Sequence, residues 1–266
     1  MYSETIDYFS EIAIQKTRVL KHSPLAFLVG AMMAGAYVGL GIILIFSVAG
    51  QVPAAFQKLI MGATFGIALT LVVFAGSELF TGHTMYMVLG WLKKQTSLLD
   101  LSKIWAASWF GNLVGSVLLA VLFVAGGGGE LLHGGIGLLH KVAEYKMNSP
   151  IIELISRAIL CNWLVCLALW MAARLKNEVA KCIAIFWCLL AFIASGFEHS
   201  VANMTLLSIS LLSEHPETIS LAGMFHNLLW VTIGNIIGGS LFMGVGYWMA
   251  SSEHAVADKH NTGTNK

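Results

Sequence analysis

Charged residues are scarce in this chain: Asp, Glu, Lys and Arg together make up 11% of its 266 residues. Soluble domains usually carry about 25%, so there is too little charge here to cover a surface that faces water. The deficit predicts that lipid is the solvent. The formal net charge of +1 also provides no basic or acidic surface for nucleic acid.

Cysteine and proline are scarce as well. The four cysteines, Cys161, Cys166, Cys182 and Cys188, fall in apolar stretches without zinc-ligand spacing, which predicts buried reduced thiols and no metal site. We expect no cofactor. With four prolines and no paired Asn-Pro-Ala motif, the chain differs from a water or glycerol pore of the aquaporin type.

Long apolar runs take the place of charge. The first, Ala26–Val48, would form a helix of about 34 Å, long enough to cross a bilayer. The sequence predicts six such segments, at 26–48, 59–92, 104–125, 151–173, 182–212 and 221–250. Glu78 interrupts the second and Glu198-His199 the fifth, so we expect helices 2 and 5 to be broken.

Both ends of the chain lack the long apolar runs of the middle. Residues 1–25 predict an amphipathic helix at the membrane surface, because Tyr2, Ile6, Phe9 and Ala13 recur at helical spacing beside charges. No cleavable signal peptide is expected. Residues 251–266 predict a disordered tail. Lys and Arg concentrate in 16–21, 93–103, 174–181 and 259–266, which would share one side, so we expect both termini in the cytoplasm.

The two halves of the transmembrane region, 26–250, resemble each other. Phe110-Gly111-Asn112-Leu113-Val114-Gly115-Ser116 in the third segment matches Ile233-Gly234-Asn235-Ile236-Ile237-Gly238-Gly239-Ser240 in the sixth. Each half, about 26–125 and 151–250, has three crossings, so the halves must be inverted. This predicts an all-α membrane protein with two inverted three-helix repeats around a midplane site.

Ionisable residues inside the spans are the candidates for function. Glu78 and Glu198 are expected to hold the freed backbone of the breaks. His199 sits at a break beside a carboxylate, and imidazole can donate a hydrogen bond or a proton to an anion. Thr81 could cap the second half-helix or donate to a passing ion. A half-helix N-terminus also suits an anion.

The two breaks also carry a family resemblance. Gly76-Ser77-Glu78-Leu79-Phe80-Thr81-Gly82-His83-Thr84 and Ala194-Ser195-Gly196-Phe197-Glu198-His199-Ser200-Val201-Ala202-Asn203-Met204 resemble the signature loops of the formate/nitrite transporter family, and Cys161–Cys166 and Val231–Asn235 match as well. The first loop is most similar to the nitrite branch. An intramembrane serine protease using Ser195 and His226 is the alternative from another class, but it would leave the duplicated breaks unexplained.

The resemblance implies an aquaporin-like fold in a homopentamer, each protomer with its own pore, in the bacterial inner membrane. The protein would be a nitrite transporter and not an enzyme, with formate or hydrosulfide as alternative substrates. It implies a pore histidine at His199 facing Thr81, with Asn162 on the fourth helix and Lys146 at the periplasmic mouth. It also implies apolar constrictions, at Phe65, Leu69, Leu79, Phe80, Val165 and Phe192, and a gating role for the N-terminal helix. Channel and proton-coupled transport both stay open.

Overall fold

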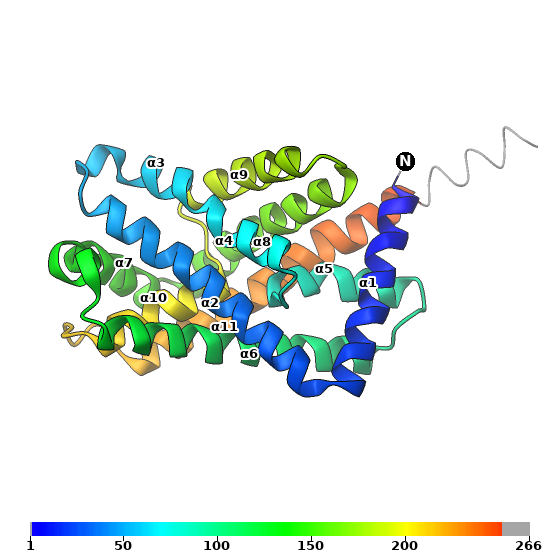
Figure 1. Ribbon diagram of the computed structural model, residues 1–266, viewed down its shortest axis with the longest axis horizontal. Coiled ribbons are helices and arrows are strands. Elements are labelled where there is room, and N and C mark those ends of the chain that lie inside the picture. The colour runs from blue at the N-terminus through cyan, green and yellow to red at the C-terminus, as the bar shows by residue number, and fades with distance from the viewer. Residues whose placement is uncertain (1, 252–266) are drawn as a thin grey trace, which may run out of the picture.

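The computed structural model describes residues 2–251, whose regular structure is helical (Figure 1). In chain order the helices are α1 (Ser3–His22), α2 (Pro24–Ala49), α3 (Ala54–Thr64), α4 (Gly66–Ala75), α5 (Phe80–Leu92), α6 (Leu98–Ala125), η1 (Leu131–Gly135), α7 (Ile136–Asn148), α8 (Ile151–Arg174), α9 (Glu178–Ala194), α10 (Ser200–Leu212), α11 (Leu221–Ile237) and η2 (Gly238–Val245). Of the tail predicted at 251–266, residues 252–266 lie outside the described residues.

Within the described residues, five helical stretches are long and apolar enough to cross a membrane: Pro24–Ala49, Ala54–Ala75, Leu98–Ala125, Ile151–Arg174 and Leu221–Ser251. A sixth apolar helix, Ser200–Leu212, is shorter. Large apolar side chains such as Leu122 and Ile152 stay exposed on the outside of the bundle, where lipid would surround them. The prediction of an all-helical membrane fold is confirmed to this extent.

Polar residues mark where these apolar helices begin. Ser97 caps α6 in a reciprocal arrangement with Asp100, and the Asn177 side chain accepts from the first backbone N–H groups of α9. Pro24 occupies the first turn of α2, where its missing N–H is no loss. In Figure 1, α1 lies at one end of the molecule and α7 at the other. We call these the α1 end and the α7 end.

Two pairs of long helices form the frame, and small residues let each pair approach closely. Helix α2 packs along α6, and α8 packs along α11. A Cβ atom placed on Gly115 of α6 would lie 1.9 Å from the Met32 carbonyl oxygen of α2, and one on Gly238 would lie 2.4 Å from the Ile159 carbonyl oxygen of α8. Glycine is therefore required at both contacts, as is common where membrane helices meet.

The short helices α5 and α10 cross between these two pairs. Helix α5 follows α4 in the chain, yet it packs on α8 and η2 as well as on α6. Helix α10 follows α9 and packs on α2 and α6 as well as on α11. Their first residues, Phe80 and Ser200, are buried inside the bundle. The segments that precede these helices are thereby brought to the centre of the protein.

Candidate functional site

Two short non-helical segments meet in the centre: the first loop, Gly76–Leu79, and the second loop, Ser195–His199. They share one backbone shape. Gly76 and Gly196 both have φ of 73°, a left-handed conformation that glycine adopts without strain. The N–H after each glycine bonds back into the preceding helix, from Ser77 to the Val72 carbonyl at 3.1 Å and from Phe197 to the Phe192 carbonyl at 3.0 Å.

One buried asparagine supports each loop. Asn112 of α6 accepts from the Phe80 N–H at 2.9 Å and donates to the carbonyls of Ala31 (2.7 Å) and Glu78 (2.9 Å). We call this three-bond arrangement an asparagine bracket. Two of these groups, the Phe80 N–H and the Glu78 carbonyl, have no helical partner, and lipid could not satisfy them.

Asn235 of α11 makes the same bracket in the second half. It accepts from the Ser200 N–H at 2.8 Å and donates to the carbonyls of Ala158 (2.8 Å) and Glu198 (2.9 Å). Both asparagines are fully buried. The repeated motif around Asn112 and Asn235 was visible in the sequence, but its loop-supporting role was missed. The signal was an amide in each copy of an otherwise apolar motif.

The loop carboxylates are buried and paired. Glu78, 8% exposed, accepts from Lys16 of α1 at 2.6 Å and lies 3.0 Å from the His83 Nε2. Within residues 2–251 the other imidazole nitrogen of His83 is buried without a hydrogen-bond partner. The sequence pattern assigned no role to His83 and did not connect Lys16 to the loop.

The second carboxylate has an equivalent pair of partners. Glu198, 1% exposed, accepts from Lys146 of α7 at 2.8 Å and from Asn203 at 2.6 Å. Each loop is thus tied to a surface helix by a lysine. A buried carboxylate needs such a partner, because an unpaired charge there would be very unfavourable.

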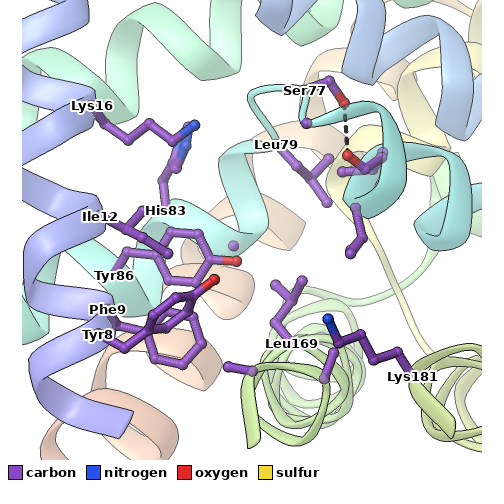
Figure 2. Close-up of a pocket in the computed structure, with 16 residues that line it drawn as sticks. Tyr8, Phe9, Ile12, Lys16, Ser77, Leu79, His83, Tyr86, Leu169 and Lys181 are labelled. Carbon is purple, nitrogen blue, oxygen red and sulfur yellow. Dashed lines mark hydrogen bonds between the residues drawn. The ribbon is translucent and has the colours of Figure 1, made fainter. Parts of the chain in front are cut away.

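Three cavities follow one another from the α7 end to the α1 end. The α7 cavity, about 240 Å³, is lined by Lys58, Lys146 and Glu198 among others. The α1 chamber, about 340 Å³, lies at the opposite end beneath Leu79 (Figure 2). Between them is a void of about 10 Å³, room for about one water molecule. We call it the constriction.

The constriction is almost wholly apolar. Its lining comprises Val38, Phe65, Ala68, Leu69, Leu79, Val165, Leu189, Phe192 and His199. Phe192 and His199 also line the α7 cavity, and Leu79 also lines the α1 chamber. The three spaces therefore adjoin one another, and the imidazole of His199 is the polar group on the wall of the smallest of them.

Hydrogen bonds fix the tautomer and position of His199. Its Nδ1 accepts from the Ala202 N–H at 3.1 Å, which leaves the hydrogen of the neutral ring on Nε2. That Nε2 lies 3.0 Å from the Thr81 hydroxyl, so it donates to Thr81. The Phe192 ring stacks on the imidazole with centroids 6.0 Å apart. A neutral donor is thus held at the constriction.

Other residues predicted for the pathway lie elsewhere. Asn162 donates to the Thr81 carbonyl (3.2 Å), the Thr84 hydroxyl (2.9 Å) and the Asn235 carbonyl (2.6 Å). It ties the two halves together behind Thr81. Phe80 lines an apolar groove of about 690 Å³ between α6 and α11, away from the constriction. His226, a candidate for the protease alternative, contacts the Ser149 carbonyl at 3.0 Å.

Comparison with known proteins decides the family. The family model described as formate/nitrite transporter matches residues 3–249. The chain belongs to the formate/nitrite transporter family. The protease alternative is therefore rejected, and this transporter-family chain is a multi-pass membrane protein.

Relatives across the formate/nitrite transporter family cover nearly the whole chain. The nitrite transporter NirC of Escherichia coli (strain K12) is 51% identical over 98% of this chain and 97% of its own length. A solved structure described as an FNT family ion channel has a TM-score of 0.90 at 51% identity and covers 93% of this chain and 99% of its own. A pentameric formate channel with formate bound has a TM-score of 0.71 at 27% identity, covering 87% and 98%.

Proposed function

We propose that this protein carries nitrite across the bacterial inner membrane through the line formed by the α7 cavity, the constriction and the α1 chamber. The observation that carries the proposal is the donor at the narrowest point: the His199 Nε2–H, held against Thr81 in an otherwise apolar wall. The 51% identity to a nitrite transporter supports nitrite as the substrate.

The physical problem for such a pathway is the anion's charge. Placing a charge in the centre of a bilayer costs several kcal/mol or more, and a constriction of about 10 Å³ cannot admit a hydration shell. The anion must lose its water in the α7 cavity. There the ammonium of Lys58 attracts it, and Lys146, although paired with Glu198, has further N–H donors to offer.

His199 then replaces part of the lost hydration. Its Nε2–H, released from Thr81, donates a hydrogen bond to the anion and stays on the ring. Nitrite that takes a proton from water in the α7 cavity would cross the apolar wall as neutral nitrous acid and return that proton to water in the α1 chamber. Lys16 stays paired with Glu78 and Lys146 with Glu198. The negative charges of the two loops therefore remain neutralised while an anion passes.

The same proposal includes the architecture. Helices α4 and α5, and likewise α9 and α10, are each the two halves of one interrupted crossing, giving six crossings in two inverted repeats. The matching brackets of Asn112 and Asn235 support this. The distribution of Lys and Arg places the α1 end and both termini in the cytoplasm. A pentameric relative of the same fold supports a homopentamer.

Formate is the second candidate, because the solved relative at 27% identity has formate bound and a single N–H donor does not distinguish two small oxyanions. The deciding experiment compares nitrite and formate uptake into proteoliposomes at equal gradients, with protein-free liposomes as the control. We expect nitrite to enter faster. Equal or reversed rates would remove the nitrite assignment and leave anion transport standing. No uptake of either anion would overturn the proposed function.

A further inference from the structure

The α1 chamber contains a hydrogen-bond donor that the pathway described so far does not use. Tyr86 of α5 stacks on Phe9 of α1, with ring centroids 4.8 Å apart and planes 13° apart. Figure 2 shows its hydroxyl pointing away from α1 into the chamber. No hydrogen bond joins this hydroxyl to any residue within 2–251. A rigidly packed ring therefore presents an uncommitted O–H to the chamber directly beyond Leu79.

The chamber also contains an ammonium group that is easily released. Lys181 of α9 lines it, and in Figure 2 this side chain extends toward Leu169. Its ammonium contacts Glu178 at 3.0 Å, but the Glu178 side chain is 64% exposed. An exposed pair of this kind contributes little, and an ammonium has three donors. Lys16, by contrast, is committed to the buried Glu78 at 2.6 Å.

Much of the remaining wall is apolar, including Val72, Leu79 and Leu169. A fixed neutral donor, one mobile cation and an apolar surround suit a small monovalent oxyanion. They would not hold a multiply charged ion, which needs several fixed charges. The donor comes from α5, which directly follows the first loop, and the cation comes from α9, which directly precedes the second loop.

We infer that the α1 chamber is a second anion-binding site, in which the Tyr86 hydroxyl donates to a nitrite-like oxyanion and Lys181 supplies the charge. This inference rests on the proposed function. An anion that passes Leu79 is held there before it reaches solvent. Tyr8 also lines the chamber, but it is 49% exposed. Its hydroxyl can already bond to water, which an anion would have to displace, so a bond from Tyr8 to the anion adds little.

The test measures occupancy of the chamber without measuring flux. A reporter thiol is placed on its wall by Ala173→Cys, in a Cys182→Ala background that removes the least buried native thiol. The purified oligomer in mild detergent reacts with methyl methanethiosulfonate while sodium nitrite replaces sodium gluconate at constant ionic strength. Mass spectrometry gives the labelling rate. Nitrite should slow labelling in a saturable manner.

Matched variants assign the contacts. Tyr86→Phe keeps the stack on Phe9 and removes only the hydroxyl, so it should raise the half-protecting nitrite concentration about three- to tenfold. Tyr8→Phe removes the exposed hydroxyl of the same chamber and should leave it unchanged. Lys181→Gln should raise it at least about threefold and weaken its salt dependence. Glu178→Gln frees the ammonium and should lower it.

Each remaining outcome overturns the inference. Absence of nitrite protection in the unvaried reporter would mean that the chamber binds no anion, even where proteoliposomes transport nitrite. Protection that shifts with Tyr8→Phe but not with Tyr86→Phe would place the donor elsewhere. A Tyr86→Phe shift that is matched by an equal loss in thermal stability, with Lys181→Gln and Glu178→Gln without effect, would make Tyr86 a packing residue only.

Discussion

Replacing Asn112 by Leu removes one bracket while nearly conserving side-chain volume. Three bonds are lost, but they do not count equally. Ala31 lies within α2, so its carbonyl keeps its helical hydrogen bond. The Phe80 N–H, at the start of α5, and the Glu78 carbonyl, in the first loop, lose their bracket partner. These two groups set the size of the effect.

A buried polar group left unpaired costs about 1–3 kcal/mol, so two such groups cost about 2–6 kcal/mol of unfolding free energy. For a chain of this length, 1 kcal/mol lowers an unfolding midpoint by about 2–4 °C. We therefore expect Asn112→Leu to unfold at least about 4 °C below the wild type. Asn235→Leu should fall by a similar amount, because its bracket leaves the equivalent N–H and carbonyl groups unpaired.

The assay is thermal unfolding of the purified oligomer in one detergent, followed by intrinsic fluorescence. Asn148→Leu is the matched control. Asn148 is exposed, although it donates to the carbonyls of Glu144 and Thr218, so water can replace it and the midpoint should move little. If Asn112→Leu melts within about 2 °C of the wild type, or no lower than Asn148→Leu, then the brackets do not stabilise the loops and the reasoning is wrong.

Three further predictions concern transport and assembly. His199→Asn keeps a donor of similar size but loses the Nε2–H held against Thr81, so nitrite flux into proteoliposomes should fall several-fold at every pH; a folded variant with wild-type flux would contradict this. Lys146→Gln should lower the initial nitrite flux several-fold and weaken the dependence of that flux on salt, measured at low and high ionic strength. Lys146→Arg should preserve both the flux and its salt dependence. Equal flux in the two variants would exclude a role for the charge. Native mass spectrometry in mild detergent should show a pentamer, and a fully active monomer would be the opposing result.

The positions of the two loops could be predicted because a charge within an apolar run is so unfavourable in lipid. Glu78 and Glu198 each stood alone in such a run, and both lie between helices in the structure. The partners of these carboxylates could not be predicted from hydropathy. Lys16 is 62 residues from Glu78 in the chain, and only the packing of α1 against α5 brings them together.

Side-chain direction was the other quantity that the sequence could not provide. Leu79 and Phe80 are neighbours at the start of α5, yet Leu79 lines the constriction and Phe80 the apolar groove. Leu79 is the extended last residue of the first loop and Phe80 is the first residue of α5, so a family pattern that assigned both to the constriction could not foresee that their side chains point to different spaces. Asn162 illustrates the same point, since its amide turns toward backbone carbonyls of both halves.

The brackets have a consequence for how this protein could be taken apart. Every bond of the Asn112 bracket lies within residues 31–112, and every bond of the Asn235 bracket within 158–235. A cut in the glycine run Gly126–Gly129 would sever neither. Each fragment of such a split protein would carry its own loop support, and the two would have to interlock through α5 and α10, with the Thr81–His199 contact formed only on reassembly.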